Sequence, residues 1–370
     1  MQANDFAQLD NRGIAKIRGW IMDAQKLQEL MGRMVGELGA ASGAALVLIG
    51  DELGLYKALA QAGPSTSAEL AARTGCAERY VREWLAAQAA AGYVEYDAAA
   101  GKFSMTPEQA AVFADENGPA FMVGAFDLVG ASIRDIPLIT AAFRSGQGVG
   151  WHEHDPALFR GVARFFRSSY ATHLLSEWIP ALDGVEARLR DGARVADVGC
   201  GHGVTTVLMA RAFPRSEFVG FDYHRPSIEQ ARKLAGEAGV GNVVFDTAAA
   251  KDYPGAGYDL VAFFDCLHDM GDPVGAAAHV YRSLKPDGVF MLVEPRAGDR
   301  LEENLNPIGR IFYAASTTVC TPASMAQEVG MALGAQAGER RMREVAQAAG
   351  FSRFRRAIET PFNAVFEVRP

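Results

Sequence analysis

A glycine-rich loop between a short apolar strand and an apolar helix is the feature that most constrains this chain of 370 residues. Glycine occupies every second position of the loop, at Gly199, Gly201 and Gly203, directly after the β-branched run 194–198. Glycine lets the backbone approach a ligand closely and adopt a positive φ without steric cost. The helix expected over 204–213 offers free N–H groups and the positive end of its dipole. The pattern therefore predicts a strand–loop–helix unit that binds a nucleotide-like molecule.

The spacing of these glycines separates two kinds of nucleotide site. A dinucleotide fingerprint, G-x-G-x-x-G, would need glycine at position 204, where the chain has Val204. The segment reads instead D-x-G-x-G-x-G, starting at Asp197 and passing through Cys200. This pattern resembles the first motif of the class I methyltransferases that use S-adenosylmethionine (SAM). The resemblance implies that Asp197, Cys200 and the three loop glycines bind SAM.

The strands expected after the loop strengthen this resemblance. The run 217–222 reads as a strand that ends in Asp222, and such a carboxylate accepts hydrogen bonds from ribose hydroxyls in nucleotide-binding sheets. Tyr223 follows directly and is placed to lie against the adenine face. The nearly uninterrupted apolar run 258–264 is typical of a central strand buried on both faces. An L-K-P-D-G turn, which also resembles this family, then opens a fifth strand over 284–294.

A helix over 338–349 and a closing hairpin formed by 354–358 and 364–368 complete the series of elements. The resemblance implies an α/β fold with a Rossmann-like sheet of seven strands in the order 3-2-1-4-5-7-6. It also implies that SAM is the co-substrate, lying across the carboxyl ends of the parallel strands.

One position departs from the family pattern. After the third strand most relatives carry an acid that accepts a hydrogen bond from the adenine amine, and here Ala249 stands at that position. Asp246 lies too early, within the strand itself. Either backbone groups near Ala249 and Ala250 read the adenine, or Asp265, which precedes Cys266 after the fourth strand, contributes. We expect Ala249, Asp265 and Cys266 to lie on the cofactor side.

Two residues at neighbouring strand ends are candidates for catalysis. Methyl transfer needs an aligned acceptor and, for a hydroxyl, removal of its proton. His268 follows the fourth strand, and imidazole has a suitable unperturbed pKa for this task. Glu294 ends the fifth strand. The pair resembles that of winged-helix O-methyltransferases, in which a histidine of an H-D-W-x-D-E motif is the base and a glutamate orients it.

The match to that motif is partial. The chain reads H-D-M-G-D from His268, with Met270 in place of tryptophan and Pro273 in place of the last glutamate. Three roles for His268 stay open: a general base, a binding or pocket residue, and a structural residue. Asp272 directly before Pro273 predicts a helix N-cap, since proline suits the first helical turn.

Residues 43–106 resemble a winged helix. Helices are expected over 44–62, over 66–75 with an N-cap and a C-terminal glycine, and over 79–91, followed by a hairpin of 93–96 and 102–105. From Ser65 to Ala90 there are three acids and three arginines, whereas DNA binding requires a cationic face. The domain is therefore expected to mediate dimerisation and to line the substrate pocket, without binding nucleic acid.

The rest of the N-terminal half divides into two segments. Apolar residues recur at helical spacing between Ile14 and Leu38, which predicts a helix whose stripe forms a subunit interface, most simply in a homodimer. Residues 107–190 are expected to be helical and to form a linker and substrate lid, with a further lid insertion over 302–324. The predicted division is thus 1–42, 43–106, 107–190 and a catalytic domain over 191–370.

Composition excludes several classes of protein. The net charge of −8 argues against a general nucleic-acid binder. No uninterrupted apolar run reaches the length of a membrane span, and Met1 is not followed by a signal-peptide pattern. The four cysteines are widely separated, and the run G-W-H-E-H-D-P at 150–156 lacks the H-E-x-x-H spacing of a helical metal site. We expect a cytoplasmic protein without a metal ion or a membrane association.

The whole chain from about residue 30 resembles a bacterial family of winged-helix class I methyltransferases of mycobacterial and proteobacterial type. The resemblance rests on segments such as G-D-E-L-G-L-Y-K-A-L, G-W-H-E-H-D-P, F-D-C-L-H-D-M-G-D-P and S-T-T-V-C-T-P. It implies SAM-dependent methylation of a small molecule, with O-methylation as the leading hypothesis. Three alternatives stay open: a SAM-binding transcriptional regulator, C- or N-methylation, and a non-methylating reaction on the same fold.

Overall fold

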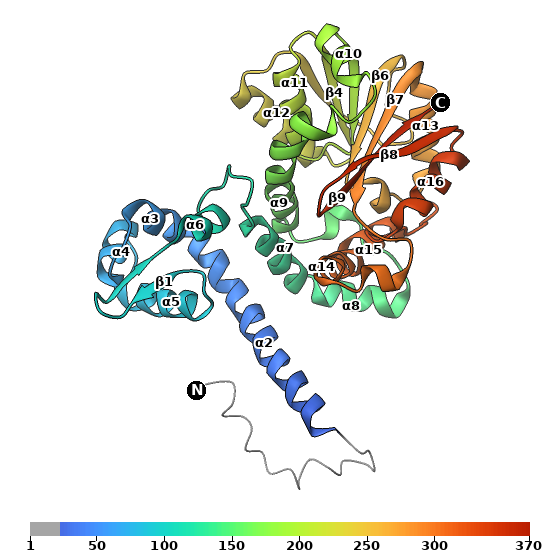
Figure 1. The fold of residues 1–370 in the computed structure, drawn as a ribbon. Coiled ribbons are helices and arrows are strands. Elements are labelled where there is room, and N and C mark those ends of the chain that lie inside the picture. Colours follow the sequence, from blue (N-terminus) through green and yellow to red (C-terminus); the bar gives the residue numbers. More distant parts are fainter. Residues whose placement is uncertain (1–22) are drawn as a thin grey trace. The chain divides into compact units, whose positions relative to one another are not determined.

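The computed structural model describes residues 23–370, and the chain separates into two compact units, Met1–Phe126 and Asp127–Pro370 (Figure 1). The four-part division predicted from the sequence stays a prediction. Ile14 and the other apolar positions before residue 23 lie outside the described residues.

The first unit contains the winged helix. Thr66 and Glu69 form a capping box at the start of its second short helix, and Gly75 ends that helix in the left-handed conformation, as predicted. Its core packs around Tyr56 and Trp84, and the Tyr56 hydroxyl donates to the buried Gln88 side chain at 2.6 Å. The elements are α2 (Ala24–Glu52), α3 (Leu55–Ala62), α4 (Ser67–Thr74), α5 (Glu78–Ala90), β1 (Glu95–Asp97), β2 (Lys102–Ser104) and α6 (Pro107–Phe113).

The boundaries of the first helices differ from the prediction. The expected single helix over 44–62 is two helices, because Gly54 adopts a φ of 67° and breaks the run between α2 and α3. The first part of that run continues instead from the N-terminal helix, so that α2 spans 29 residues. By length and composition α2 could cross a membrane, and only 17% of its most apolar window is buried. Core helices of soluble proteins and signal sequences share this length and composition.

The second unit contains the seven-stranded sheet, whose order β5-β4-β3-β6-β7-β9-β8 is the predicted 3-2-1-4-5-7-6. The first five strands of that order pair in parallel, and β9 pairs antiparallel with both β7 and β8. The strands are β3 (Arg194–Val198), β4 (Glu217–Asp222), β5 (Val243–Thr247), β6 (Tyr258–Phe264), β7 (Leu284–Pro295), β8 (Arg353–Glu359) and β9 (Asn363–Arg369).

Two apolar clusters fill the two faces of this sheet. One cluster joins β6, β7 and β9 to α13 and α16, and the other joins the same strands to α10 and α11. All seven residues of β6 are buried, as expected for a central strand with both faces covered. The helices are α7 (Val123–Arg134), α8 (Ile136–Ser145), α9 (Ala157–His173), α10 (Val185–Asp191), α11 (Val204–Ala212), α12 (Arg225–Ala238), α13 (Pro273–Ser283), α14 (Pro307–Ala315), α15 (Thr321–Met325) and α16 (Gly338–Ala348).

Short helical turns complete the second unit: η2 (Trp151–Glu153), η3 (Leu174–Trp178), η4 (Leu267–Asp269), η5 (Leu301–Asn304) and η6 (Ser316–Cys320). Two of them, η3 and η6, are single π-helical turns that continue α9 and α14. Such turns occur often at functional sites, because they re-aim the side chains that follow.

Candidate active site

A cavity of about 560 Å³ lies at the carboxyl ends of the parallel strands. Its lining includes the glycine loop, the residues after β4, β5 and β6, and side chains from α9 and α14. The volume is in the usual range for a small-molecule site. The candidate residues that line it are Gly199, Cys200, Gly201, Asp222, Tyr223, Ala249, Asp265, Cys266 and His268.

The three loop glycines have positive φ angles of 75°, 52° and 77°. A Cβ on Gly199 would lie 2.7 Å from the Cys266 sulfur, and one on Gly203 would lie 2.7 Å from the Phe245 ring. A Cβ on Gly201 would meet no atom within 4 Å. The first and third glycines are therefore required by packing, whereas the middle one leaves its backbone open to a ligand.

Asp222 holds the loop from the end of β4. Its carboxylate accepts hydrogen bonds from the backbone N–H groups of Gly201 at 2.9 Å and His224 at 2.8 Å. Burial raises the pKa of Asp222, and these two donors oppose that rise. Hydrogen bonds thus join the glycine loop to Asp222 at the cavity wall, and Tyr223 lies half-exposed beside them.

Asp197 lies behind the loop and does not line the cavity itself. Its Oδ2 accepts hydrogen bonds from the hydroxyls of Thr205 and Thr206, each at 2.6 Å, and Thr205 lines the cavity. Its buried Oδ1 has no hydrogen-bond partner within residues 23–370. Burial raises the pKa of Asp197 to about 6, against the effect of both hydroxyls. A cationic ligand at the loop would relieve this buried charge, which fits the ammonium and sulfonium groups of SAM.

The segment that follows β5 brings no carboxylate to the cavity within residues 23–370. Asp246 lies within β5, paired with β4, and is exposed; Ala249 lines the cavity together with Ala248 and Ala250. Asp272 also lines the cavity, and it caps α13 by accepting from the Gly275 N–H at 2.8 Å, which confirms the predicted N-cap.

Asp265 is held in a strained backbone conformation at the end of β6, with a φ of 51°. Its carboxylate accepts from the Tyr170 hydroxyl at 2.8 Å and from the Asn363 amide at 2.8 and 3.0 Å. Burial, and then the charge of Glu294, raise the pKa of Asp265 to about 8. Sequence patterns gave no signal for Tyr170 or Asn363, because both lie more than 90 positions from Asp265.

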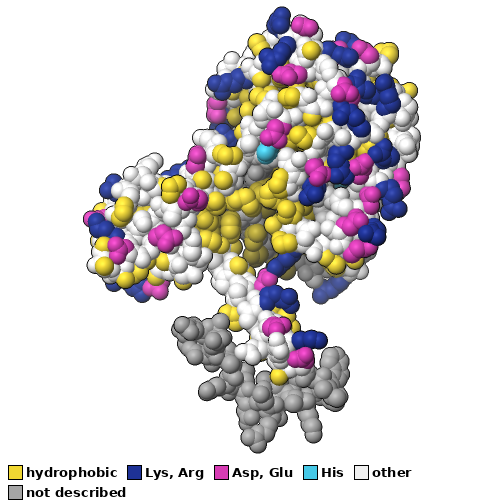
Figure 2. All heavy atoms as spheres, viewed as in Figure 1, with side chains coloured by type: hydrophobic (Ala, Val, Ile, Leu, Met, Phe, Trp, Pro, Cys, Tyr) yellow, Lys and Arg dark blue, Asp and Glu magenta, His cyan; other side chains and the backbone are white. Residues whose placement is uncertain are grey.

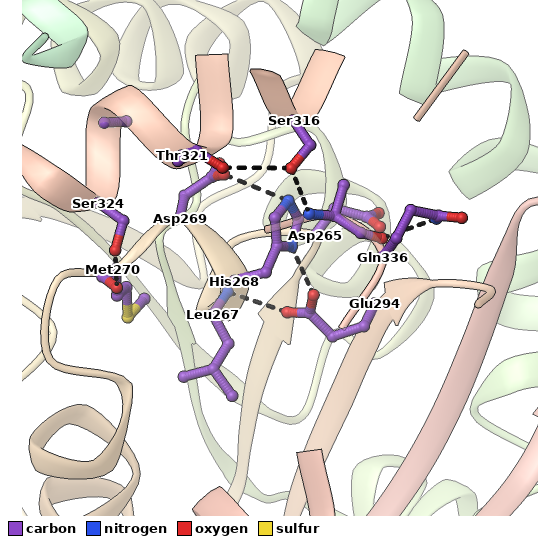
Figure 3. A network of polar contacts seen from close by, with 12 residues as sticks. Asp265, Leu267, His268, Asp269, Met270, Glu294, Ser316, Thr321, Ser324 and Gln336 are labelled. Atoms are coloured by element: carbon purple, nitrogen blue, oxygen red, sulfur yellow. Dashed lines mark hydrogen bonds and ion pairs between the residues drawn. The ribbon is translucent and has the colours of Figure 1, made fainter. Parts of the chain in front are cut away.

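His268 and Glu294 point toward one another at the ends of β6 and β7 (Figure 3). The Nδ1 of His268 lies 2.5 Å from Glu294 Oε2, and Glu294 Oε1 accepts from the Leu267 N–H at 2.9 Å. The Nε2 of His268 lies 3.2 Å from Asp269 Oδ1. Burial lowers the pKa of His268, but Asp269 and Glu294 more than offset this and hold it well above the usual value.

Cys320 brings a thiol to the same place from η6. Its sulfur and the ligand atoms of His268 and Asp269 all lie within 4.8 Å of one another. Burial, and then the charge of Asp269, raise the pKa of the Cys320 thiol to about 12. The segment S-T-T-V-C-T-P that contains Cys320 carries only a family resemblance, and no local pattern in the sequence relates it to His268.

The remaining wall of the cavity is apolar. Aromatic side chains come from η2, α9 and α14, where the sequence led us to expect a pocket and a lid. Phe159 stacks on the His224 ring, with centroids 4.6 Å apart. The aliphatic and aromatic side chains in this wall include Leu128, Trp151, Leu158, Phe159, Val162, Phe165, Phe166, Phe264, Ile311, Phe312 and Val319.

The segment 150–156 folds so that its polar residues diverge. Asp155 pairs with Arg134, and His154 is buried with its Nδ1 2.8 Å from Asp135 Oδ2. The Nε2 of His154 has no hydrogen-bond partner in the described part of the chain. Of the insertion after β7, Asn304 hydrogen-bonds to the backbone N–H and carbonyl of Gly298, and Asn306 caps α14 by accepting from the Gly309 N–H.

Comparison with known proteins identifies two domains in this chain. Residues 189–350 match the family described as methyltransferase domain, and residues 41–114 match the Rv2258c-like winged HTH domain. The chain thus contains a methyltransferase domain, preceded by an Rv2258c-like winged HTH domain.

Curated relatives match about a third of the chain. The uncharacterized methyltransferase YcgJ of Bacillus subtilis (strain 168) is 33% identical over 129 residues, which are 34% of this chain and 50% of that protein. The 27-O-demethylrifamycin SV methyltransferase of Amycolatopsis mediterranei is 33% identical over 131 residues, 33% of this chain and 48% of that protein. The chain spans about half the length of these curated relatives.

Solved structures match nearly the whole chain in fold. Human N-acetylserotonin methyltransferase in complex with SAM has a TM-score of 0.69 at 17% identity, covering 95% of this chain and 99% of that one. The mitomycin 7-O-methyltransferase MmcR has a TM-score of 0.68 at 20% identity, covering 94% and 100%. At these identities the likeness concerns the fold.

Proposed function

We propose that this chain is a SAM-dependent methyltransferase that methylates a hydroxyl group of an apolar small molecule. One observation carries the proposal: a single cavity joins the glycine loop and Asp222 to the polar group around His268. The first set suits the donor, and the second lies at the ends of β6 and β7, where the acceptor would meet the methyl group.

The reaction is a displacement in one step. Bound SAM supplies a methyl group already activated by the positive sulfur. The acceptor oxygen forms its bond to the methyl carbon while the carbon–sulfur bond breaks, its electron pair goes to sulfur, and the hydroxyl proton leaves. The chain must therefore align the two molecules and either accept the hydroxyl proton or favour its release.

The donor end would be bound by the loop and the acids around it. Gly201 leaves its own backbone open to the ligand, and Asp222 is placed for the ribose hydroxyls. Asp197, behind the loop, would act on the cationic end through its buried negative charge. Tyr223 and Ala249 would contact the adenine. The other members of the proposed cofactor set are Gly199, Cys200, Gly203, Asp265 and Cys266.

The acceptor end supports an apolar, uncharged substrate. Lys251 is the one lysine or arginine among the cavity-lining residues of the described chain, and it is paired with Glu328. The acceptor region itself is lined by aromatic and aliphatic side chains. Without a free cation, a substrate with several carboxylates would lose its hydration there and gain no compensating partner.

We propose His268 and Glu294 as the catalytic residues that activate the acceptor hydroxyl. Glu294 fixes the ring and its tautomer, while Nε2 is the nitrogen on the Asp269 side. Between two carboxylates His268 rests as the imidazolium, which cannot take a proton. Activation then requires either that Asp269 turns away or that another cation replaces the proton.

The test uses methyl transfer from labelled SAM to a panel of neutral phenols, quinols and polyketide-like alcohols. We expect transfer to at least one acceptor. The variant His268→Ala should lower kcat by about 10²–10⁴-fold with S-adenosylhomocysteine (SAH) affinity unchanged. Asp222→Ala should instead weaken SAH binding by about 2–3 kcal/mol in calorimetry, the value of hydrogen bonds to a charged acceptor. Unchanged SAH affinity in Asp222→Ala would refute the assignment of the donor site.

We further propose a homodimer formed through α2 and a cytoplasmic location. Helix α2 exposes Leu30, Met31, Met34, Val35 and Leu38 on its surface. All four cysteines are free thiols, which supports a reducing compartment. On the visible face of the winged-helix unit, Lys and Arg are interspersed with Asp and Glu, which supports the absence of a nucleic-acid partner (Figure 2).

A further inference from the structure

Two segments far apart in the chain place three metal-binding side chains at one point of the cavity wall. His268 and Asp269 come from η4 after β6, and Cys320 comes from the end of η6. Their ligand atoms lie within 4.8 Å of one another, and His268 and Cys320 are buried. We propose that His268 Nε2, Asp269 Oδ1 and Cys320 Sγ bind a divalent transition-metal ion of the zinc type.

The donor set fits such an ion. Zinc takes nitrogen, sulfur and carboxylate oxygen ligands, and catalytic zinc sites combine three protein ligands with one open position. Magnesium and calcium prefer oxygen donors alone, so a thiol and an imidazole argue against them. Since His268, Asp269 and Cys320 all line the cavity, the open position would face the space assigned to the acceptor.

The surroundings of His268 are those of a metal-bound histidine. Metal ligands of this type donate their second ring N–H to a carboxylate, which fixes the ring with its other nitrogen toward the ion. Glu294 does this at Nδ1, and it is itself fixed by the Leu267 N–H. This arrangement leaves Nε2 on the side of Asp269 and Cys320.

Buried charge supplies an independent argument. Asp269 and Glu294 are 8% and 2% exposed, and among the described residues His268 is the one basic side chain paired with either carboxylate. A single imidazolium balances only one of the two negative charges. Buried carboxylates are normally paired or coordinate a metal, so a divalent ion would compensate both charges.

A second histidine lies close by in the same unit. His154 acts electrostatically on Asp269, and its buried Nε2 has no partner in the described chain. Its Nδ1 is fixed by Asp135, in the same manner as Glu294 fixes His268. His154 does not line the cavity, so it adds a buried imidazole behind the site and is not one of the proposed ligands.

This inference rests on the proposed function only for the role of the ion, which would bind the acceptor oxygen and favour loss of its proton. The binding itself is tested with Co²⁺, a spectroscopic substitute for zinc, on the reduced full-length chain. We expect one equivalent of Co²⁺ to give a thiolate-to-metal charge-transfer band and tetrahedral d–d bands, and Zn²⁺ to displace it.

Variants identify the ligands. Cys320→Ser should remove the charge-transfer band, and Asp269→Asn should weaken Co²⁺ binding while keeping the band. Glu294→Gln should weaken it by about 10–100-fold, as loss of a carboxylate behind a ligand does. Cys76→Ser, which changes a thiol in the other unit, should behave as the unmodified chain. Circular dichroism and SAH binding verify that each variant is folded.

The outcomes separate this inference from the proposed function. Absence of stoichiometric Co²⁺ and Zn²⁺ binding at micromolar protein, or an unchanged spectrum in Cys320→Ser, overturns the metal site. Full methyl transfer by protein stripped with a chelator overturns the proposed role of the ion in catalysis, while the methyltransferase proposal stands. A Co²⁺ spectrum lost in Cys320→Ser, without methyl transfer to any acceptor, supports the metal site and counts against the proposed function.

Discussion

Asp197 shows how one residue behind the glycine loop can control the donor site. Its carboxylate is buried, with hydroxyl donors on one oxygen and none on the other, and its pKa is raised to about 6. An ammonium or sulfonium group at the loop favours the ionised form. The ligand-binding affinity must then fall when acid protonates this carboxylate.

We predict that SAH affinity falls about fourfold between pH 8 and pH 5.5, because about three quarters of Asp197 is protonated at the lower value. Calorimetry at the two pH values measures this. The variant Asp197→Asn should show a much smaller change, with the remainder due to Asp222, whose pKa is also raised, and to the nearby His202 and His224. An identical pH dependence in both proteins would contradict the prediction.

At the scale of the element, the loop between β3 and α11 contains two kinds of glycine. Gly199 and Gly203 are required by close packing, whereas Gly201 leaves space for a ligand. Gly201 and Gly54 form a matched pair: both have positive φ, 52° and 67°, and at neither would a Cβ meet an atom within 4 Å. Only Gly201 lines the cavity.

We predict that Gly201→Ala and Gly54→Ala each lose about 1–2 kcal/mol of stability, the cost of a left-handed conformation for a residue with a Cβ. Thermal or denaturant unfolding measures this loss. Gly201→Ala should in addition weaken SAH binding at least tenfold, since its methyl group occupies the ligand space, whereas Gly54→Ala should bind normally. Normal SAH affinity in Gly201→Ala would show that the loop does not contact the ligand.

At the scale of the whole molecule, helix α2 exposes an apolar surface that no other described part of the chain covers. Five large apolar side chains between Leu30 and Leu38 are at least 40% exposed, which is unusual for one helix of a stable monomer. A second copy of the chain would cover them.

We predict that the intact chain is a dimer at micromolar concentration and that the double variant Met34→Glu, Leu38→Glu is a monomer with normal SAH binding. Light scattering measures both. Leu301→Glu, which places the same charge on an exposed leucine of the other unit, is the control and should remain dimeric. A monomeric intact chain would end the proposal, and association of that monomer with lipid vesicles would assign α2 to a membrane surface.

The sequence alone determined the sheet. Strand bounds at β3, β4 and β6 agree with the prediction to the residue, because buried parallel strands give continuous apolar runs between turn signals. The strand order agrees with what the family resemblance implied. The sequence also placed the glycine loop and brought out Asp222, His268 and Glu294, since each lies at or shortly after the end of a strand. It missed the break at Gly54, because an Ala- and Leu-rich run hides a single left-handed residue.

Only the tertiary structure decided what surrounds those residues. Asp265 meets Tyr170 and Asn363, and His268 meets Cys320, across long separations in the chain. Local periodicity carries no information about such pairs, since they depend on how α9 and the insertion after β7 pack over the strand ends. The same packing removes Asp269 and Glu294 from water, and this burial, not the residue types themselves, gives the site its unbalanced charge.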